Sequence, residues 1–328
     1  MTANPILVEV LRGGVIESIH RGRACVVDSE GKLMRAWGDV NAPICPRSST
    51  KPFQALPLVA TGAADGFSLG DEDIALACAS HSGEPEHTSR IAAWLARLDL
   101  SADDLACGAH APSGAAAYEA LIRGGGTPGR IHNNCSGKHT GFLTVAQHLG
   151  VMTRGYHHVD HPVQQLVLEC LGDMSDCDPE GFQTVCDGCS APNVFMPLRA
   201  LALAWARLGT SQEAAPHRIV DAMKKHPVLM SGHGRPCATL IDAMSGRGIV
   251  KTGAEGVFAA ALPEQGLGVA VKIDDGAGRA AIIAITAILE SLNAFKSDAA
   301  ESVRGLKKPI VTSWAGEPAG VMRPAAFI

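Results

Sequence analysis

Strand-like sequence lies at both ends of this chain, and helical sequence fills the middle. Residues 15–37 alternate between apolar and polar side chains around a turn at residues 28–31, which predicts a β-hairpin. Residues 256–262 and 267–273 are apolar and are separated by a turn with proline and glycine, which predicts a second hairpin. We therefore expect an α/β (α+β) fold, in which one antiparallel or mixed sheet is assembled from both termini and covered by helices.

Between the hairpins, apolar residues recur at helical spacing, and most of these stretches end at glycine or proline. The expected helices span residues 48–60, 87–98, 115–123, 138–149, 162–171, 197–208, 213–225 and 278–293. The short apolar run at residues 74–77 is expected to end a strand. Because no repeat or low-complexity linker interrupts the pattern, we expect a single domain over residues 1–328, with residues 297–328 packing back on it.

Composition excludes several classes of function. The formal net charge of −5 provides no basic field for a polyanion, and 4% aromatic residues leave few stacking platforms for bases, so nucleic acid is not an expected partner. The N-terminus lacks the basic start and apolar run of a secretory signal, and the longest apolar stretch, residues 280–289, is too short to span a bilayer. The ten cysteines are scattered rather than densely spaced, which favours reduced thiols and a cytoplasmic protein without a membrane partner.

Ser48 and Lys51 form a Ser-x-x-Lys pair, the pattern of a nucleophile with its own base. If Ser48 begins a helix, the lysine three residues later shares its face and can reach the hydroxyl. Lysine accepts a proton only when neutral, which requires burial or a nearby cation to lower its pKa from about 10.4. Lys251, in a Lys-Thr-Gly segment, is a candidate for that cation. The order Ser-x-x-Lys and then Lys-Thr-Gly is also found in penicillin-recognising serine hydrolases.

Other polar residues are candidates for a site. Arg47 can hold a carboxylate with two hydrogen bonds. Ser80 follows the apolar run at residues 74–77 and is a candidate second serine with Lys251 as its partner, although it can also simply satisfy turn amides. Residues 132–139 place seven reactive or polar side chains directly before a helix, where Asn and Ser donors suit an oxyanion or a substrate carboxylate.

Cys186 and Cys189 form a C-x-x-C pair. Together with Cys135 and His139 they can supply four ligands for tetrahedral zinc, and they can equally form a redox pair. Asp187, between the two cysteines, is a candidate for binding a substrate amine.

Seven motifs taken together resemble the rhizobial-type (thermolabile-type, class 3) L-asparaginases, which are distinct from the asparaginases that use threonine. The motifs run in order over nearly the whole chain, at residues 47–52, 78–82, 135–139, 160–162, 187–189, 251–254 and 272–276. The resemblance implies hydrolysis of L-asparagine to L-aspartate and ammonia. It also implies a homodimer and a fold similar to serine β-lactamases and serine-type glutaminases.

The resemblance also implies roles for single residues. Two Ser-Lys tandems are implied, Ser48 with Lys51 and Ser80 with Lys251. One zinc ion per chain is implied beside the substrate, with the ligands Cys135, Lys138 and Cys189. Cys186 is an additional thiol outside the family pattern.

We therefore expect an amidohydrolase in which Ser48 attacks the side-chain amide and Lys51 moves the proton to the departing ammonia, before water cleaves the acyl-enzyme. Ser80 and Lys251 would complete the proton relay. The residues expected to bind the amino-acid head group are Arg47, His139, Asp187 and Gly188. Two alternatives remain, a penicillin-recognising serine hydrolase and a zinc or thiol sensor that depends on the cysteines.

Overall fold

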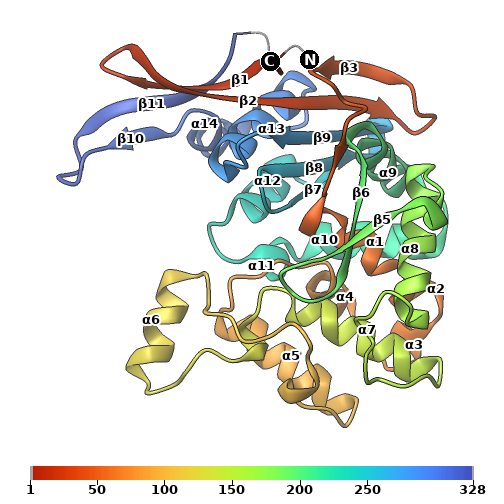
Figure 1. Ribbon diagram of the computed structural model, residues 1–328. Helices are drawn as coiled ribbons and strands as arrows, with labels where there is room; N and C mark the ends of the chain where they lie inside the picture. Colours follow the sequence, from red (N-terminus) through yellow and green to blue (C-terminus); the bar gives the residue numbers. More distant parts are fainter. Residues whose placement is uncertain (1–2, 327–328) are drawn as a thin grey trace. The chain divides into compact units, whose positions relative to one another are not determined.

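The computed structural model describes residues 3–326, and the chain divides into two compact units. The first combines the N-terminal segment up to residue 49, residues 196–210 and the segment from residue 239 onward. The second combines residues 50–195 and 211–238. Each unit therefore brings together segments that are far apart in the sequence, as the colours of Figure 1 show.

The first unit is built on an antiparallel sheet with the strand order β10-β11-β1-β2-β9-β8-β7, and β3 also pairs with β2. The strands are β1 (Ile6–Arg12), β2 (Val15–Asp28), β3 (Leu33–Trp37), β7 (Ile249–Thr252), β8 (Val257–Leu262), β9 (Leu267–Ile273), β10 (Ile310–Thr312) and β11 (Pro318–Pro324). Both predicted hairpins are present, and β2 pairs with β9 in the register Cys25↔Ala270. The prediction of one sheet assembled from both termini is confirmed.

Helices pack directly on this sheet. The unit contains α9 (Leu198–Thr210), α13 (Gly278–Ser291), α14 (Ala300–Lys307) and the larger part of α12 (Pro236–Met244). A Cβ atom at Gly268 would lie 1.9 Å from the Ala202 carbonyl oxygen, so β9 accepts α9 only because this position is glycine. Short strand β4 (Pro43–Ile44) pairs with Met196 and Pro197, the end of β6 (Pro192–Pro197).

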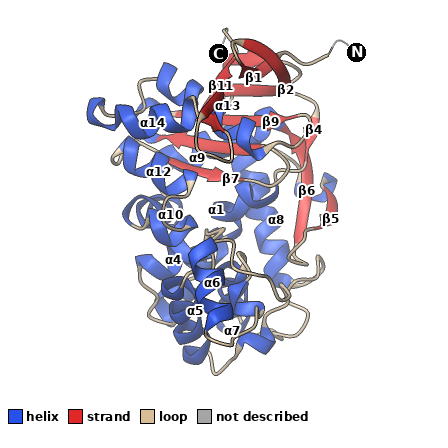
Figure 2. Cartoon of the chain, turned by 90° about the vertical axis from the view of Figure 1, so that its left-hand side faces the viewer, coloured by secondary structure: helices blue, strands red, loops and turns tan. Residues whose placement is uncertain are grey.

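The second unit is mostly helical (Figure 2). Its helices are α1 (Lys51–Gln54), α2 (Leu56–Ala60), α3 (Ala63–Gly66), α4 (Asp71–Ala77), α5 (Pro85–Arg97), α6 (Ala115–Arg123), α7 (Ser136–His148), α8 (Pro162–Ser175), α10 (Ala214–Lys225) and α11 (Pro227–Ser231). Strand β5 (Gln183–Cys186) pairs with residues 192–195 of β6. Helix α7 is buried over most of its length, and a Cβ atom at Gly137 would lie 2.4 Å from the Leu76 carbonyl oxygen, so α7 begins in close contact with the end of α4.

Two local predictions were wrong. The helix expected over residues 48–60 is divided into α1 and α2, because Pro57 has no N–H to continue the first helix. The run at residues 74–77, expected to end a strand, is the end of helix α4. Three acidic residues, Asp71, Glu72 and Asp73, fill the first turn of α4, where the helix dipole favours negative charge, and this signal identifies the helix better than the apolar run does.

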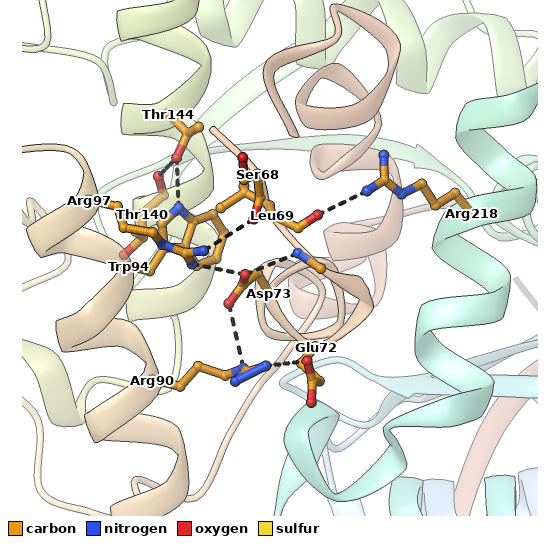
Figure 3. Close-up of polar contacts among 11 residues, drawn as sticks. Ser68, Leu69, Glu72, Asp73, Arg90, Trp94, Arg97, Thr140, Thr144 and Arg218 are labelled. Atoms are coloured by element: carbon orange, nitrogen blue, oxygen red, sulfur yellow. Dashed lines mark hydrogen bonds and ion pairs between the residues drawn. The ribbon is translucent and has the colours of Figure 1, made fainter. Parts of the chain in front are cut away.

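The buried carboxylate of Asp73 joins α4 to α5 (Figure 3). Its Oδ2 accepts hydrogen bonds from the Gly70 N–H at 3.2 Å and from Arg97 Nη2 at 2.9 Å, and Arg90 Nε lies 3.5 Å from Oδ1. Trp94 of α5 donates to Thr144 Oγ1 of α7 at 3.0 Å. These contacts fix α4, whose C-terminal end carries the loop that contains Ser80. No helix in residues 3–326 is long and apolar enough to cross a membrane.

Candidate active site

The segment that carries Ser48 is held in an unusual backbone conformation within the first unit. Arg47 has a φ of 53°, in the left-handed region that non-glycine residues rarely adopt, and it lies directly before half-buried Ser48. The hydroxyl of Ser49 donates to the Pro46 carbonyl at 2.7 Å, and Trp205 Nε1 donates to the Ser49 carbonyl at 3.2 Å. The backbone around Ser48 is thereby fixed on both sides.

The Lys-Thr-Gly segment lies against this same stretch of the first unit. Lys251 is fully buried in β7, and its Nζ donates to the Thr252 carbonyl at 3.0 Å. A Cβ atom at Gly253 would lie 2.5 Å from the Pro46 carbonyl oxygen, so the glycine permits the close approach. Two motifs separated by about two hundred residues in the sequence are therefore neighbours.

Lys51 is buried at the start of α1 in the second unit, and its ammonium group contacts three acceptors. Nζ donates to the Ala79 carbonyl at 2.5 Å, to Ser80 Oγ at 3.0 Å and to the Asn134 carbonyl at 3.1 Å. A lysine ammonium has three N–H donors, so this set satisfies it completely. A neutral amine must keep its two N–H groups on the carbonyls, which only accept, and its lone pair then faces the Ser80 hydroxyl.

The structure thus brings together Lys51 and Ser80, two residues that the sequence assigned to different Ser-Lys pairs. The pairings of Ser48 with Lys51 and of Ser80 with Lys251 stay predictions. Spacing along the sequence could not reveal the Lys51–Ser80 contact, because Lys51 begins α1 whereas Ser80 lies in the loop after α4, 29 positions away.

Three of the cysteine-region residues form a buried polar cluster. Lys138 Nζ donates to Cys189 Sγ at 3.0 Å, and Cys135 lies at the N-cap of α7 beside them. The neighbouring Cys135 thiol and the charge of Lys138 hold the pKa of Cys189 well below its usual range, although burial opposes this. Cys189 and burial raise the pKa of Cys135, whose Sγ donates to Asn134 Oδ1 at 3.2 Å. Burial alone would lower the pKa of Lys138, but the two sulfur atoms raise it overall. Lys138, Cys189 and Cys135 therefore form one buried cluster in which the pKa of Cys189 is lowered and those of Lys138 and Cys135 are raised.

His139 lies next to this cluster and is fully buried. Its Nδ1 is 2.7 Å from the Tyr156 hydroxyl, which also accepts a hydrogen bond from the Ala106 N–H at 2.8 Å. Burial lowers the pKa of His139 to about 4, so the ring is neutral at physiological pH. Its Nε2 is buried without a hydrogen-bond partner among the described residues. Tyr156 was not identified from the sequence, where it appears as an ordinary loop aromatic.

The side chains of this region include donor types that bind zinc, thiol sulfur and imidazole nitrogen, and Cys135, Cys189 and His139 are all buried. Among the described residues, however, their ligand atoms do not form a group in which all lie within 4.8 Å of one another. Lys138 must lose its proton to join them as a ligand. Cys186 is exposed while Cys189 is buried, so the C-x-x-C pair brings only one of its thiols into the cluster.

Asp187 and Gly188 lie in the turn between β5 and β6. The Asp187 carboxylate accepts hydrogen bonds from the Gly188 N–H at 2.6 Å and from Asn193 Nδ2 at 2.9 Å. Ser190, in the same turn, has a φ of 70°, a second left-handed non-glycine residue in a candidate segment. These contacts hold a half-buried negative charge on a rigid turn next to Cys189.

The chain was compared with known proteins. The family model described as L-asparaginase II matches residues 8–324. Among solved structures, a β-lactamase from Mycobacterium bovis is 15% identical, with 82% of this chain and 94% of that chain covered and a TM-score of 0.43. Mglu in its native form is 14% identical, with 83% of this chain and 64% of that chain covered and a TM-score of 0.47, so this chain spans less than two thirds of Mglu. The comparison with curated proteins found no match.

The family match agrees with the motifs and extends over nearly all of the chain. It includes every candidate residue, from Arg47 to Lys251. The protein is an amidohydrolase of the L-asparaginase II family.

Proposed function

We propose that this protein is an L-asparaginase, which hydrolyses the side-chain amide of L-asparagine to L-aspartate and ammonia through an acyl-enzyme. The family match supports amide hydrolysis. The observation that carries the proposal further is the buried Lys51, whose Nζ lies 3.0 Å from Ser80 Oγ with two carbonyls beside it. This arrangement suits a base that exchanges a proton with a hydroxyl.

In the proposed reaction, Ser48 Oγ attacks the amide carbon while its proton passes to neutral Lys51. The tetrahedral intermediate then expels ammonia, which takes the proton from Lys51, and the aspartyl group remains as an ester on the serine. Water attacks the ester and gives a proton to Lys51, which passes it to the departing Ser48 oxygen, so that aspartate is released and the serine hydroxyl and neutral lysine are restored. Ser80, hydrogen-bonded to Lys51, is proposed to relay this proton, with Lys251 as the second lysine of the two tandems.

The head group of asparagine presents one carboxylate and one ammonium group. We assign the carboxylate to Arg47 and the ammonium group to Asp187, because these side chains carry the complementary charges. Gly188 and His139 complete the proposed head-group site, His139 from its buried position beside Cys189.

The ligands of the proposed zinc ion are Cys135, Lys138 and Cys189, one ion per chain. When bound, the ion would supply a fixed positive charge near the substrate. Without it, the hydrogen bond from Lys138 Nζ to Cys189 Sγ already joins the first turn of α7 to residue 189.

Ammonia release separates the proposed function from its alternatives. We expect steady release of ammonia from L-asparagine, no hydrolysis of benzylpenicillin, and no change in ammonia release at saturating asparagine when the thiols are reduced or oxidised before the assay. Hydrolysis of penicillin without ammonia release would identify a penicillin-recognising hydrolase. A protein inert toward both, whose zinc content or conformation follows thiol oxidation, would be a sensor.

A further inference from the structure

His81, the residue after Ser80, is buried and makes two directional hydrogen bonds. Its Nδ1 accepts from the Gly83 backbone N–H at 3.1 Å, and its Nε2 lies 2.9 Å from Ser136 Oγ. The Ser136 hydroxyl in turn donates to the Ile131 carbonyl at 2.9 Å. The imidazole also stacks on His87, with ring centroids 5.1 Å apart.

The direction of every hydrogen bond in this chain of contacts is determined. A backbone N–H only donates, so Nδ1 of His81 has no proton and Nε2 carries the proton of the neutral ring. The Ser136 hydroxyl gives its proton to a carbonyl and therefore accepts the one from Nε2. Burial lowers the pKa of His81 well below its usual value, and the neighbouring His87 and Lys51 act in the same direction, so the ring keeps this neutral tautomer.

The two segments joined by the His81–Ser136 hydrogen bond also carry the three hydrogen-bond acceptors of Lys51. Ala79 and Ser80 belong to the loop between α4 and α5, and Asn134 lies two residues before Ser136 at the start of α7. Lys51 contacts all three at once, so its position depends on the loop and the start of α7 keeping a fixed separation. The His81–Ser136 hydrogen bond spans that separation one residue from Ser80.

We infer that His81 is a positioning residue for the Ser-Lys chemistry: its imidazole links the Ser80 loop to the first turn of α7 and so fixes Ser80 Oγ and the Asn134 carbonyl around Lys51. The inference rests on the proposed function. It assigns no proton transfer to His81, because both ring nitrogens are already engaged and neither has a free lone pair.

Two substitutions at His81 separate the hydrogen bond made by Nδ1 from the one made by Nε2. The amide of His81→Gln reaches the place of Nε2 and can still donate to Ser136, whereas the amide of His81→Asn reaches only the place of Nδ1. We expect His81→Asn to lower kcat for asparagine about 10- to 100-fold with little change in KM, since a displacement of about 1 Å near the reacting groups has effects of that size. His81→Gln should recover most of the loss. His148→Asn, at an exposed histidine bonded to the Thr61 carbonyl, is the matched control and should keep full activity.

A double-mutant cycle distinguishes this role from general stabilisation of the fold. Ser136→Ala should reduce kcat as His81→Asn does, and the double variant should lose little more, because both changes break one link. If the two losses in kcat multiply in the double variant, or if the folded variants keep a normal kcat, the inference is overturned. If His81→Asn does not fold, Ser136→Ala and His81→Gln carry the same test.

Two further measurements do not depend on the substrate. Nitrogen NMR of the histidine rings should show His81 as the neutral Nε2–H tautomer from pH 5 to 8, and crystal structures should show Lys51 Nζ further from Ser80 Oγ in Ser136→Ala than in wild type. An inactive wild type that gives both results would contradict only the proposed substrate. An unchanged distance or a titrating His81 would overturn the positioning role.

Discussion

Among single residues, Lys51 has surroundings that fit both of its protonation states. As an ammonium group it satisfies two carbonyls and the Ser80 hydroxyl, and as an amine it must accept from that hydroxyl. A base that alternates between these states needs no movement of its neighbours. This supports a lysine rather than a histidine as the proton acceptor, since burial lowers the pKa of both His81 and His139 and so makes them weaker bases.

Lys51→Arg should therefore be nearly inactive, with kcat for asparagine reduced about 10²- to 10⁴-fold, the usual contribution of a general base. Arginine keeps the positive charge and the donors, but it does not release its proton under these conditions. Lys272→Arg is the matched control, because Lys272 Nζ also donates to two carbonyls, those of Glu255 and Ile273. An active Lys51→Arg enzyme would show that Lys51 acts only through its charge.

The C-x-x-C pair provides an equally direct test of the thiol cluster. Purified protein should contain close to one zinc per chain by elemental analysis, and Cys189→Ser should lose it, because Cys189 is the buried member of the pair, with its Sγ hydrogen-bonded to Lys138. Cys186→Ser, at the exposed member of the pair, should keep it. The main kinetic effect of losing the metal should be a higher KM. Protein that neither contains nor binds zinc would refute the metal site.

Sequence reasoning identified the residues of the candidate site better than their partners. Cys135, Lys138 and Cys189 lie in motifs, but the hydrogen bond between Lys138 and Cys189 joins residues 51 positions apart that only the fold brings together. Ser80 and Lys51 were both singled out, yet their contact joins the loop after α4 to the start of α1. Tyr156 and Ser136 have contacts with His139 and His81 that no spacing rule predicts.

At the scale of elements, helices with clear ends were predicted closely. Residues 115–123 form α6, and the helix expected from residue 162 begins there as α8 with proline in its first turn. Helix α4 was missed because its apolar part is only four residues long, and such a run does not distinguish a strand from a buried helix. Its three first-turn acidic residues were the better signal, and Asp73 among them also forms ion pairs with α5.

The buried His81, which joins the Ser80 loop to α7, predicts how the stability of the fold depends on pH. The pKa of His81 is lowered in the folded protein. Below the pKa of about 6.5 in the unfolded chain, the unfolded chain therefore binds a proton at this residue that the folded protein does not bind. Its contribution is complete above that pH and is lost as the pH falls, by up to about 1.4 kcal/mol per pH unit. In urea unfolding at pH 7, 6 and 5, the free energy of unfolding should fall less steeply with decreasing pH in His81→Gln than in wild type, by up to this amount. An identical slope in the two proteins would mean that His81 is protonated in the folded state.

At the scale of the whole molecule, the sheet joins the two ends of the chain. The hairpins β2–β3 and β8–β9 were predictable, because a local turn determines each of them. The pairing of β2 with β9, and of β1 with β11, joins segments more than two hundred residues apart, and only the general tendency of half-buried strands to share a sheet indicated it. In the first unit, this sheet places the Lys-Thr-Gly segment beside Pro46 and Ser48's segment.

The chain belongs to the L-asparaginase II family, and we propose Ser48 as its catalytic nucleophile. The most direct test is the intact mass of the protein, measured after rapid mixing with L-asparagine and acid quench. We predict that a fraction of wild-type chains gains the mass of one aspartyl group, located on the peptide that contains Ser48. Ser48→Ala should show neither the adduct nor ammonia release while keeping its fold. Normal ammonia release by Ser48→Ala, or an adduct carried by another residue, would contradict the account.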